Sequence, residues 1–334
     1  ELVEGEAQEI VRADRTVKLR GGRSLGYDRL VLANGSHPFI PPIPGAGREG
    51  VMTLRTLANA RDILERAAAG ARVVCIGGGL LGLETAGALA RRGLSVTVLE
   101  GHEALLPRQL AEPAGRLLVS HVEKTGITVL TLARAKEILG DEAVRGVLLE
   151  SGEEIPADMV MLATGVRPNS CLARQAGLSV RTGVVVDDRM ATSDPAILAC
   201  GDVAEHRGVL YGIWPTAYAQ GVVAGVNAGG GGASFPGMPP ANSLKVLDVE
   251  LLSVGTIHAE DASSQGLEEQ DEAAGTCRRL VCRDGRLVGA ILFGDTSLGS
   301  QLKEAIEEGV QLLERPRLLQ AVPGLAGLLG RRPA

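Results

Sequence analysis

The chain has 334 residues, of which 22% are charged, and a formal net charge of −6. It is long enough for two or three domains with substantial cores, and its acidic balance argues against a nucleic-acid partner, which needs a basic surface. The longest apolar stretch, residues 318–330, is interrupted by Pro323 and is shorter than the roughly 20 residues that span a bilayer, so we expect no membrane span.

The first predicted elements belong to an internal repeat. Residues 17–38 align without gaps on residues 147–168, at a constant offset of 130 residues. Each copy predicts a strand, a turn at Gly22 or Gly152, a second strand and a nearly continuous apolar strand. Two copies of one supersecondary unit imply two related domains. The apolar strands end in Ala33, Asn34 and Gly35 and in Ala163, Thr164 and Gly165.

A glycine-rich turn precedes the second copy. Residues 72–100 predict a strand, a turn, a helix and a second strand, and the turn contains the pattern G-x-G-x-x-G. Gly77 allows the tight turn, Gly79 lets the backbone approach a pyrophosphate, and Gly82 lets the helix pack on the strand. The helix N-terminus adds unpaired amides and positive potential. The predicted contact residues of this turn are Gly77, Gly79, Leu81 and Gly82.

Glu100 ends the second strand, where a carboxylate accepts hydrogen bonds from the ribose hydroxyls of a dinucleotide. A carboxylate there also repels a 2′-phosphate, and no arginine follows it directly in residues 100–102 (EGH). The sequence therefore favours NAD over NADP. A tight turn without a ligand is the alternative.

The repeat predicts where the first domain's own glycine turn belongs. In the second copy Gly77 precedes Gly165 by 88 residues, so the counterpart of Gly77 would lie upstream of residue 1. We therefore expect the segment that carries this turn to be missing from the sequence given.

With these motifs the chain resembles the two-dinucleotide-binding-domain flavoproteins, or pyridine nucleotide-disulfide oxidoreductase superfamily. The resemblance rests on the glycine turn and on residues 32–38 (LANGSHP), 162–168 (LATGVRP) and 197–202 (ILACGD). It implies an α/β fold class: two Rossmann-like three-layer dinucleotide-binding domains, the first discontinuous and N-terminally truncated, plus a small α+β C-terminal domain. The implied boundaries are 1–56 and 168–236 for the FAD-binding domain, 57–167 for the NAD(P)-binding domain and 237–334 for the C-terminal domain.

The resemblance also implies the cofactor contacts. It places Asp202 on the ribityl chain of FAD and points the N-terminus of a helix that begins near Pro215 at the flavin, where positive potential stabilises the reduced ring. Trp214 fits this site or a role as a core anchor. The implied FAD contacts are Ala33, Asn34, Gly35, Gly201, Asp202, Trp214, Pro215 and Thr216. The implied NAD contacts add Glu100, Ala163, Thr164 and Gly165 to the glycine turn.

Glu84, on the first turn of the glycine-turn helix, lies where the family places a carboxylate near the nicotinamide. A solvent-facing glutamate beside a favourable helix dipole is the alternative. The cofactors carry the chemistry, with hydride passing from the nicotinamide C4 to the flavin N5. We expect no metal site, because the five histidines show no metal-ligand spacing.

The five cysteines form no metal-type Cys-x-x-Cys pair and no disulfide framework, which indicates a reducing, cytoplasmic setting. Cys75 and Cys200 fall inside apolar strands and are interpreted as small buried residues. Cys277 and Cys282 lie five positions apart on a predicted strand that enters a hairpin turn at residues 283–286, so we expect them to face opposite sides of it.

Residues 105–110 (LLPRQL), 242–246 (NSLKV) and 287–296 (LVGAILFGDT) are similar to the FAD/NAD portion of NADH-dependent nitrite reductase large subunits and to rubredoxin-NAD reductases. This resemblance implies an NAD(P)H-dependent flavoprotein oxidoreductase that passes electrons from NADH through FAD to rubredoxin, ferredoxin or a nitrite reductase partner, and it allows a homodimer. One alternative is a thiol-using NADH oxidase, peroxidase or disulfide reductase. Another is a non-catalytic nucleotide-binding regulatory protein.

Overall fold

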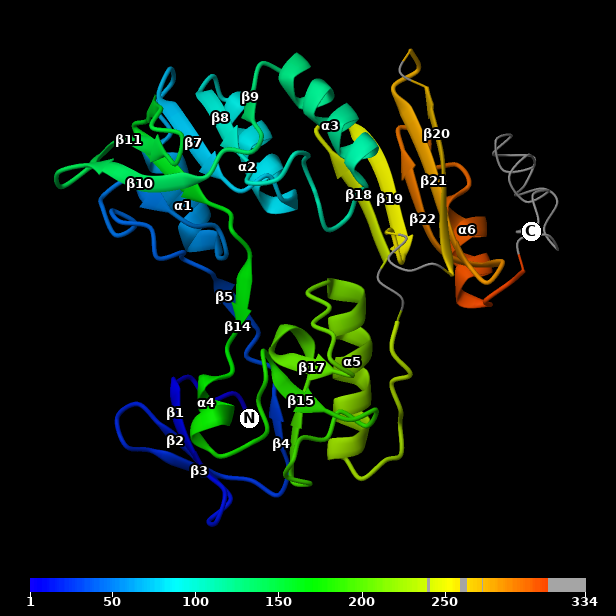
Figure 1. Ribbon diagram of the computed structural model, residues 1–334. Coiled ribbons are helices and arrows are strands. Elements are labelled where there is room, and N and C mark those ends of the chain that lie inside the picture. Colours follow the sequence, from blue (N-terminus) through cyan, green and yellow to red (C-terminus); the bar gives the residue numbers. More distant parts are fainter. Residues whose placement is uncertain (239–240, 259–262, 272, 312–334) are drawn as a thin grey trace. The chain divides into compact units, whose positions relative to one another are not determined.

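The computed structural model (Figure 1) describes residues 1–238, 241–258, 263–271 and 273–311. The chain divides into two compact units. Unit 1 comprises Glu1–His37 and Val166–Met238, and unit 2 comprises Pro38–Gly165 and Pro239–Ala334. The apolar stretch at 318–330 lies outside the described residues. Among the described residues, unit 1 has one hydrophobic core and unit 2 has three clusters of its own.

The centre of unit 2 is a five-stranded parallel sheet. Its strands in spatial order are β6 (Val51–Met52), β13 (Met159–Leu162), β7 (Arg72–Ile76), β8 (Ser95–Leu99) and β9 (Thr128–Leu130). The accompanying helices are α1 (Leu57–Arg66), α2 (Leu80–Ala90) and α3 (Glu112–Lys124). Strands β7 and β13 are nearly all apolar because a parallel sheet is covered on both faces. The strand order reverses between β7 and β13, the position at which open α/β sheets bind ligands.

The structure confirms the predicted repeat. Unit 1 contains the antiparallel sheet β1 (Ala7–Val11), β2 (Thr16–Leu19) and β3 (Ser24–Gly26), and unit 2 contains β10 (Ala135–Gly140), β11 (Val144–Leu149) and β12 (Glu154–Pro156). The turns fall at Gly22 and Gly152, with φ of 89° and 91°. Strands β3 and β12 differ by the offset of 130 residues, as do β5 (Ser36–Pro38) and β14 (Val166–Pro168).

A pair of parallel strands organises unit 1. β4 (Leu30–Leu32) pairs with β16 (Ile197–Ala199), so that Leu32 and Ala199 end at the same edge. A second parallel pair joins β15 (Val184–Val186) and β17 (Ala204–His206). The helical elements are α4 (Cys171–Gln175), the 3-10 turn η1 (Gly201–Val203) and α5 (Trp214–Ala228). Pro215 lies in the first turn of α5, as predicted.

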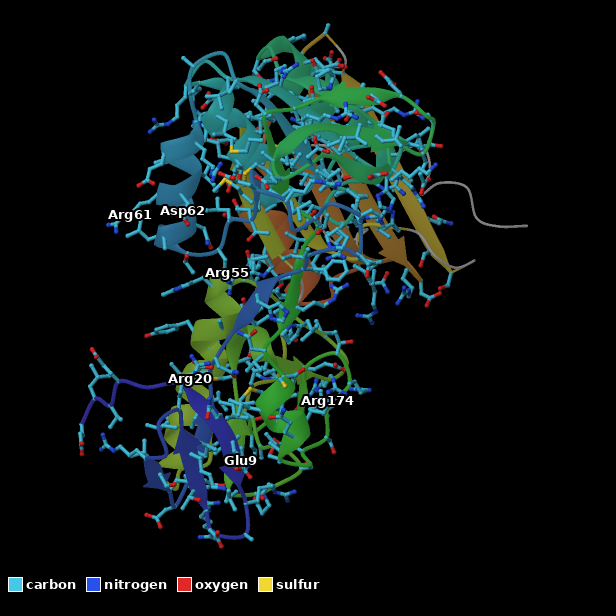
Figure 2. All side chains as sticks on the ribbon, turned by 90° about the vertical axis from the view of Figure 1, so that its left-hand side faces the viewer. Glu9, Arg20, Arg55, Arg61, Asp62 and Arg174 are labelled. Atoms are coloured by element: carbon cyan, nitrogen blue, oxygen red, sulfur yellow. The ribbon has the colours of Figure 1, made fainter. Side chains whose placement is uncertain are left out.

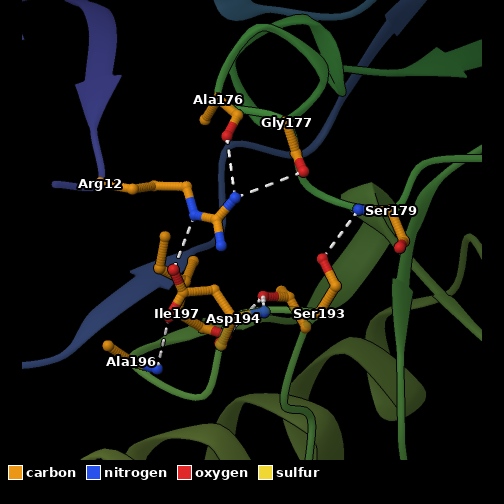
Figure 3. Close-up of polar contacts among 9 residues, drawn as sticks. Arg12, Ala176, Gly177, Ser179, Ser193, Asp194, Ala196 and Ile197 are labelled. Carbon is orange, nitrogen blue, oxygen red and sulfur yellow. Dashed lines mark hydrogen bonds and ion pairs between the residues drawn. The ribbon is translucent and has the colours of Figure 1, made fainter.

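Arg12, which directly follows β1, holds three segments of unit 1 together (Figure 3). Its Nε donates to Asp194 Oδ2 at 2.7 Å, and its Nη1 donates to the carbonyl oxygens of Ala176 and Gly177 at 3.3 and 3.4 Å. The Ala196 amide and the Arg12 guanidinium hold the pKa of the Asp194 carboxyl below its usual value. These contacts join the first antiparallel sheet to the end of α4 and to the turn before β16.

The C-terminal part of unit 2 is a five-stranded antiparallel sheet. Its order is β18 (Ala241–Val246), β19 (Val249–Gly255), β22 (Arg286–Phe293), β21 (Thr276–Arg283) and β20 (Ser264–Asp271), with α6 (Gly299–Glu307) packed against one face. Cys277 belongs to the cluster that includes α3, and Cys282 to the cluster that includes Leu302 of α6, so the prediction that they face opposite sides is confirmed. Burial raises the pKa of Cys277 to about 12 and that of Cys282 to about 11.

Charged side chains lie on the outside of the helices and antiparallel sheets. On α1, Arg61 and Asp62 point away from the ribbon (Figure 2) and are exposed, whereas Ile63 beside them is buried. Glu9 and Arg20 are exposed on or beside the first antiparallel sheet in the same way. The helix α1 is therefore amphipathic and packs one face on the parallel sheet.

Asp158 fixes the start of the central sheet, and its removal should weaken unit 2. Arg72 donates to Asp158 from Nη2 at 2.6 Å, from Nε at 3.1 Å and from its backbone amide at 2.9 Å. These bonds lower the pKa of Asp158 to about 2. Because the side chain is 47% exposed, Asp158→Asn should cost only about 0.5–1 kcal/mol at neutral pH.

The pH dependence of that loss identifies its cause. A carboxyl whose pKa is depressed on folding stabilises the protein above its unfolded pKa and loses this effect as the pH falls through the folded value. The stability difference between wild type and Asp158→Asn should therefore be full above about pH 4 and shrink toward pH 2. Asp141→Asn serves as the control, because it removes the same negative charge from another exposed aspartate. A difference that stays constant in chemical denaturation from pH 7 to pH 3 would contradict the assignment.

Candidate functional site

The glycine turn of unit 2 follows β7 and is closed tightly by its own backbone. Gly77 has φ of 116°, and a Cβ there would lie 2.5 Å from the carbonyl oxygen of Ala163. A Cβ on Gly82 would lie 2.1 Å from the Gly77 carbonyl oxygen. Gly79 is extended at φ −77° and ψ 175°, and nothing lies within 4 Å of its Cβ position. Gly77 and Gly82 are thus required by the fold, whereas Gly79 faces open space.

The N-terminus of α2 is a second feature of this turn. Gly79 is the N-cap and supplies no side-chain cap, so the first amides of the helix have no intrahelical acceptor. These amides and the helix dipole form a site for an anion such as a pyrophosphate. Leu81, in the first turn, is 42% exposed.

Glu100 lies against the glycine turn. Its Oε2 accepts from the Gly78 amide at 2.9 Å, and its Oε1 accepts from the His102 amide at 2.9 Å and lies 2.7 Å from His102 Nδ1. The residue is 7% exposed. The carboxylate at the end of β8 is therefore held in place next to the backbone that would receive the pyrophosphate.

The end of β13 completes the group of predicted NAD contacts in unit 2. Ala163 packs on Gly77, and Thr164 Oγ1 donates to the Phe39 carbonyl oxygen at 2.7 Å. The Gly165 carbonyl accepts from the Phe39 amide at 2.9 Å. All eight predicted NAD residues follow the carboxyl ends of β7, β8 and β13 or lie in the first turn of α2.

Glu84 does not lie where we predicted within its helix. Because the extended turn ends at Gly79, α2 begins at Leu80 and has no acidic residue in its first turn. Glu84 is the fifth helical residue and is exposed. Its role near a nicotinamide stays a prediction.

The corner that follows β16 in unit 1 contains Asp202. Gly201 has φ of 75°, and its amide donates to Gln220 Oε1 of α5 at 2.9 Å. Ser36 Oγ, next to the end of β4, donates to Asp202 Oδ2 at 2.9 Å. The Cys200 amide donates to the Leu32 carbonyl oxygen at 3.0 Å, so the two strand ends lie side by side.

The loop after β4 faces the segment after β14. Ala33 and Asn34 are exposed, and Gly35 has φ of 66°. Asn34 Nδ2 donates to the Asn169 carbonyl oxygen at 2.8 Å, and Asn169 Nδ2 donates to the Asn34 carbonyl oxygen at 2.6 Å. His37 Nδ1 lies 2.6 Å from Asn169 Oδ1. Asn169 therefore fixes the conformation of the predicted loop.

Trp214 and Thr216 occupy opposite sides of the first turn of α5. Trp214 is 76% exposed and stacks on Tyr218, with ring centroids 5.3 Å apart, so the alternative of a core anchor is wrong. Thr216 is fully buried, and its Oγ1 donates to Met238 Sδ at 3.7 Å. Thr216 therefore presents no exposed surface to a ligand. Pro215 is exposed beside them.

Sequence reasoning missed Ser36, Asn169 and Gln220. Each contacts a predicted residue from a distant part of the chain. Ser36 lies inside the motif at residues 32–38, so its position was available, but nothing in the sequence pairs it with Asp202. The Gln220 Nε2 atom is buried and has no hydrogen-bond partner among the described residues.

The cysteines within the two cores carry no activated thiolate. Burial raises the pKa of Cys75 to about 12 and also raises that of Cys200, which confirms both as small buried residues. Among the described residues no group of three or more His, Cys, Asp or Glu side chains could hold a metal ion. No helix in the same part of the chain is both long and apolar enough to cross a membrane.

Two family models match the chain. Residues 1–221 match the pyridine nucleotide-disulphide oxidoreductase family. Residues 240–310 match the rubredoxin NAD+ reductase C-terminal domain. Together they cover both units and nearly all the described residues.

Individual proteins give the same result. The nitrite reductase (NAD(P)H) of Bacillus subtilis is 37% identical over 313 residues, which cover 92% of this chain and 39% of that protein. The NADH-rubredoxin oxidoreductase of Clostridium acetobutylicum is 30% identical over 88% of this chain and 73% of its own length. The structure of a NAD-dependent persulfide reductase from A. fulgidus superposes with a TM-score of 0.86 and 32% identity, covering 94% of this chain and 63% of that one. The chain spans about two fifths of the length of the first curated relatives it matches.

Proposed function

We propose, because this chain belongs to the pyridine nucleotide-disulphide oxidoreductase family, that it is the FAD- and NAD-binding part of an enzyme that takes hydride from NADH. The observation that carries the proposal is that each of the two units, which share the repeat, has a candidate nucleotide site of its own. Unit 2 has the Gly77 turn with Glu100, and unit 1 has the Gly201 corner with Asp202. Each lies at the carboxyl ends of parallel strands, where such folds bind nucleotides.

The residues of unit 1 fit FAD. The Asp202 carboxylate, steadied by Ser36, would accept hydrogen bonds from the ribityl hydroxyls. The unpartnered Gln220 Nε2 fits a group that brings hydrogen-bond acceptors to the corner. The N-terminus of α5, which has no side-chain cap, would stabilise negative charge on the reduced ring. FAD, when bound, supplies the redox chemistry.

The residues of unit 2 fit NADH. The first amides of α2 would hold the pyrophosphate, and Glu100 would accept from the adenosine ribose, which favours NADH over NADPH. Ala163, Thr164 and Gly165 would line the path toward the nicotinamide. We also propose the domain boundaries of 1–56 with 168–236 for FAD, 57–167 for NAD and 237–334 for the C-terminal domain.

We propose a small electron-carrier protein, such as rubredoxin or ferredoxin, or a nitrite reductase partner as the acceptor, in the cytoplasm. The matched C-terminal domain model and the two relatives support this choice. A thiol-dependent reductase is the second candidate, since a persulfide reductase shares the fold. The buried cysteines Cys75 and Cys200 would not serve it, because their thiols resist ionisation.

Anaerobic addition of NADH to the full-length protein, reconstituted with FAD, tests the proposed function. We expect the yellow flavin absorbance to bleach with NADH, and more slowly with NADPH. Rubredoxin, ferredoxin, a nitrite reductase partner, oxygen and disulfides are then compared as oxidants of the reduced protein. A protein that takes up no flavin, or whose flavin does not bleach, would favour a regulatory nucleotide-binding role instead.

A further inference from the structure

A second chain segment lies against the ribose end of the candidate NAD site. The Glu100 amide donates to the Leu130 carbonyl oxygen at 2.9 Å, and the Ala133 amide donates to the Glu100 carbonyl oxygen at 2.9 Å. The Leu132 amide donates to the His102 carbonyl oxygen at 3.0 Å. Backbone bonds therefore fix the connection between β9 and β10 alongside the turn that contains Glu100.

This connection brings Arg134 onto Gly101. A Cβ at Gly101 would lie 3.5 Å from Arg134 Cγ and 3.6 Å from Arg134 Nε, so the arginine side chain lies beside the open face of this glycine. The Glu150 amide donates to the Arg134 carbonyl oxygen at 2.9 Å and holds its main chain. Arg134 is exposed, and in the described part of the chain no ion pair joins its guanidinium to Glu100 or to another carboxylate.

The charges at this turn oppose each other in their effect on a 2′-phosphate. Glu100 would repel such a group. Its two carboxylate oxygens, however, accept hydrogen bonds from the backbone amides of Gly78 and His102, and these amides partly offset its negative charge. The Arg134 guanidinium presents several donors in a planar fork, the arrangement that binds phosphate oxygens well. An arginine is absent from the positions that directly follow Glu100, but the fold brings Arg134 to this turn from the connection between β9 and β10.

We propose that Arg134 is a specificity-determining residue that lets the site accept a nicotinamide nucleotide bearing a 2′-phosphate as a second, weaker donor. The inference rests on the proposed function, because it assigns Glu100 and its turn to the adenosine ribose. Arg134 acts on the 2′-phosphate and leaves the binding of the unphosphorylated nucleotide to Glu100 and the glycine turn.

Calorimetric titration of the full-length protein with 5′-AMP and with 2′,5′-ADP tests this inference without any flavin reaction. We expect wild type to bind both, and Arg134→Gln to weaken 2′,5′-ADP about five- to tenfold while changing 5′-AMP less than about twofold. Lys136→Gln is the matched control, because it removes the same charge from an exposed position two residues further along the chain. It should leave both ligands within about twofold of wild type. Added salt should weaken 2′,5′-ADP more than 5′-AMP.

Three outcomes would overturn the inference. If Arg134→Gln binds 2′,5′-ADP like wild type, or loses both ligands equally, the arginine does not read the 2′-phosphate. If wild type binds 5′-AMP but not 2′,5′-ADP, the site excludes the phosphate and the proposed NADH reductase still stands. If wild type binds neither ligand, the nucleotide site itself is wrong and the proposed function falls with it.

Discussion

Replacing Gly79 with valine is expected to weaken NADH binding at least about 30-fold while unit 2 remains folded. The φ and ψ of Gly79 are extended and suit any residue, and nothing lies within 4 Å of its Cβ position. The added side chain would instead occupy the space in which a pyrophosphate approaches the amides of α2. Losing charge-assisted hydrogen bonds there costs about 2 kcal/mol. Calorimetry measures the affinity, and thermal melting checks the fold.

Gly82→Ala provides the contrast within the same turn. Its Cβ would lie 2.1 Å from the Gly77 carbonyl oxygen, so this variant should lose stability as well as affinity. The two glycines thus separate a residue required by the ligand from one required by the fold. A Gly79→Val protein that binds NADH as tightly as wild type would show that the pyrophosphate does not lie at this turn.

The second large effect is expected at Asp202. We predict that Asp202→Ala weakens FAD binding at least about 100-fold in the full-length protein, because the substitution removes the carboxylate that we propose as the acceptor for the ribityl hydroxyls. It also leaves the hydroxyl of Ser36, a residue only 7% exposed, without this acceptor, which should lower the stability of the free protein by about 1 kcal/mol. Ultrafiltration followed by measurement of released flavin gives the affinity. Ser36→Ala alone should weaken FAD only about fivefold.

Asp14→Ala is the control for charge and truncation, since Asp14 is exposed in the turn between β1 and β2. It should retain FAD fully. The Asp202→Ala protein should still bind 5′-AMP, because the candidate NAD site belongs to unit 2. Stoichiometric FAD in the purified Asp202→Ala protein would show that Asp202 does not contribute to FAD binding.

Elements with strong local patterns were predictable from the sequence. The repeat located β3, β5, β12 and β14, because glycine turns and apolar strands recur in phase. The position of Glu84 in α2 was predicted wrongly, because the helix already begins at Leu80 and Glu84, its fifth residue, lies just past the first turn. A glycine pattern does not specify where its turn ends.

Contacts between distant segments were not predictable. Nothing in the sequence pairs Ser36 with Asp202, or Gln220 with Gly201, since these bonds form only after β4, β16 and α5 have packed. Arg134 shows the same limit. The sequence rule for a 2′-phosphate considers only the residues that follow the acidic position. In the structure, hydrogen bonds between neighbouring segments instead place Arg134, on the connection between β9 and β10, beside Gly101.

The division of unit 1 into Glu1–His37 and Val166–Met238 has a consequence for biosynthesis. Strand β4 cannot pair with its parallel neighbour β16 until the ribosome has translated the intervening part of unit 2, Pro38–Gly165. The glycine turn, β8 and β13 are by then already made, and domains generally fold as units in the order of their synthesis. The strands that carry the candidate nicotinamide nucleotide site are thus all synthesised before the strands of the candidate flavin corner can pair.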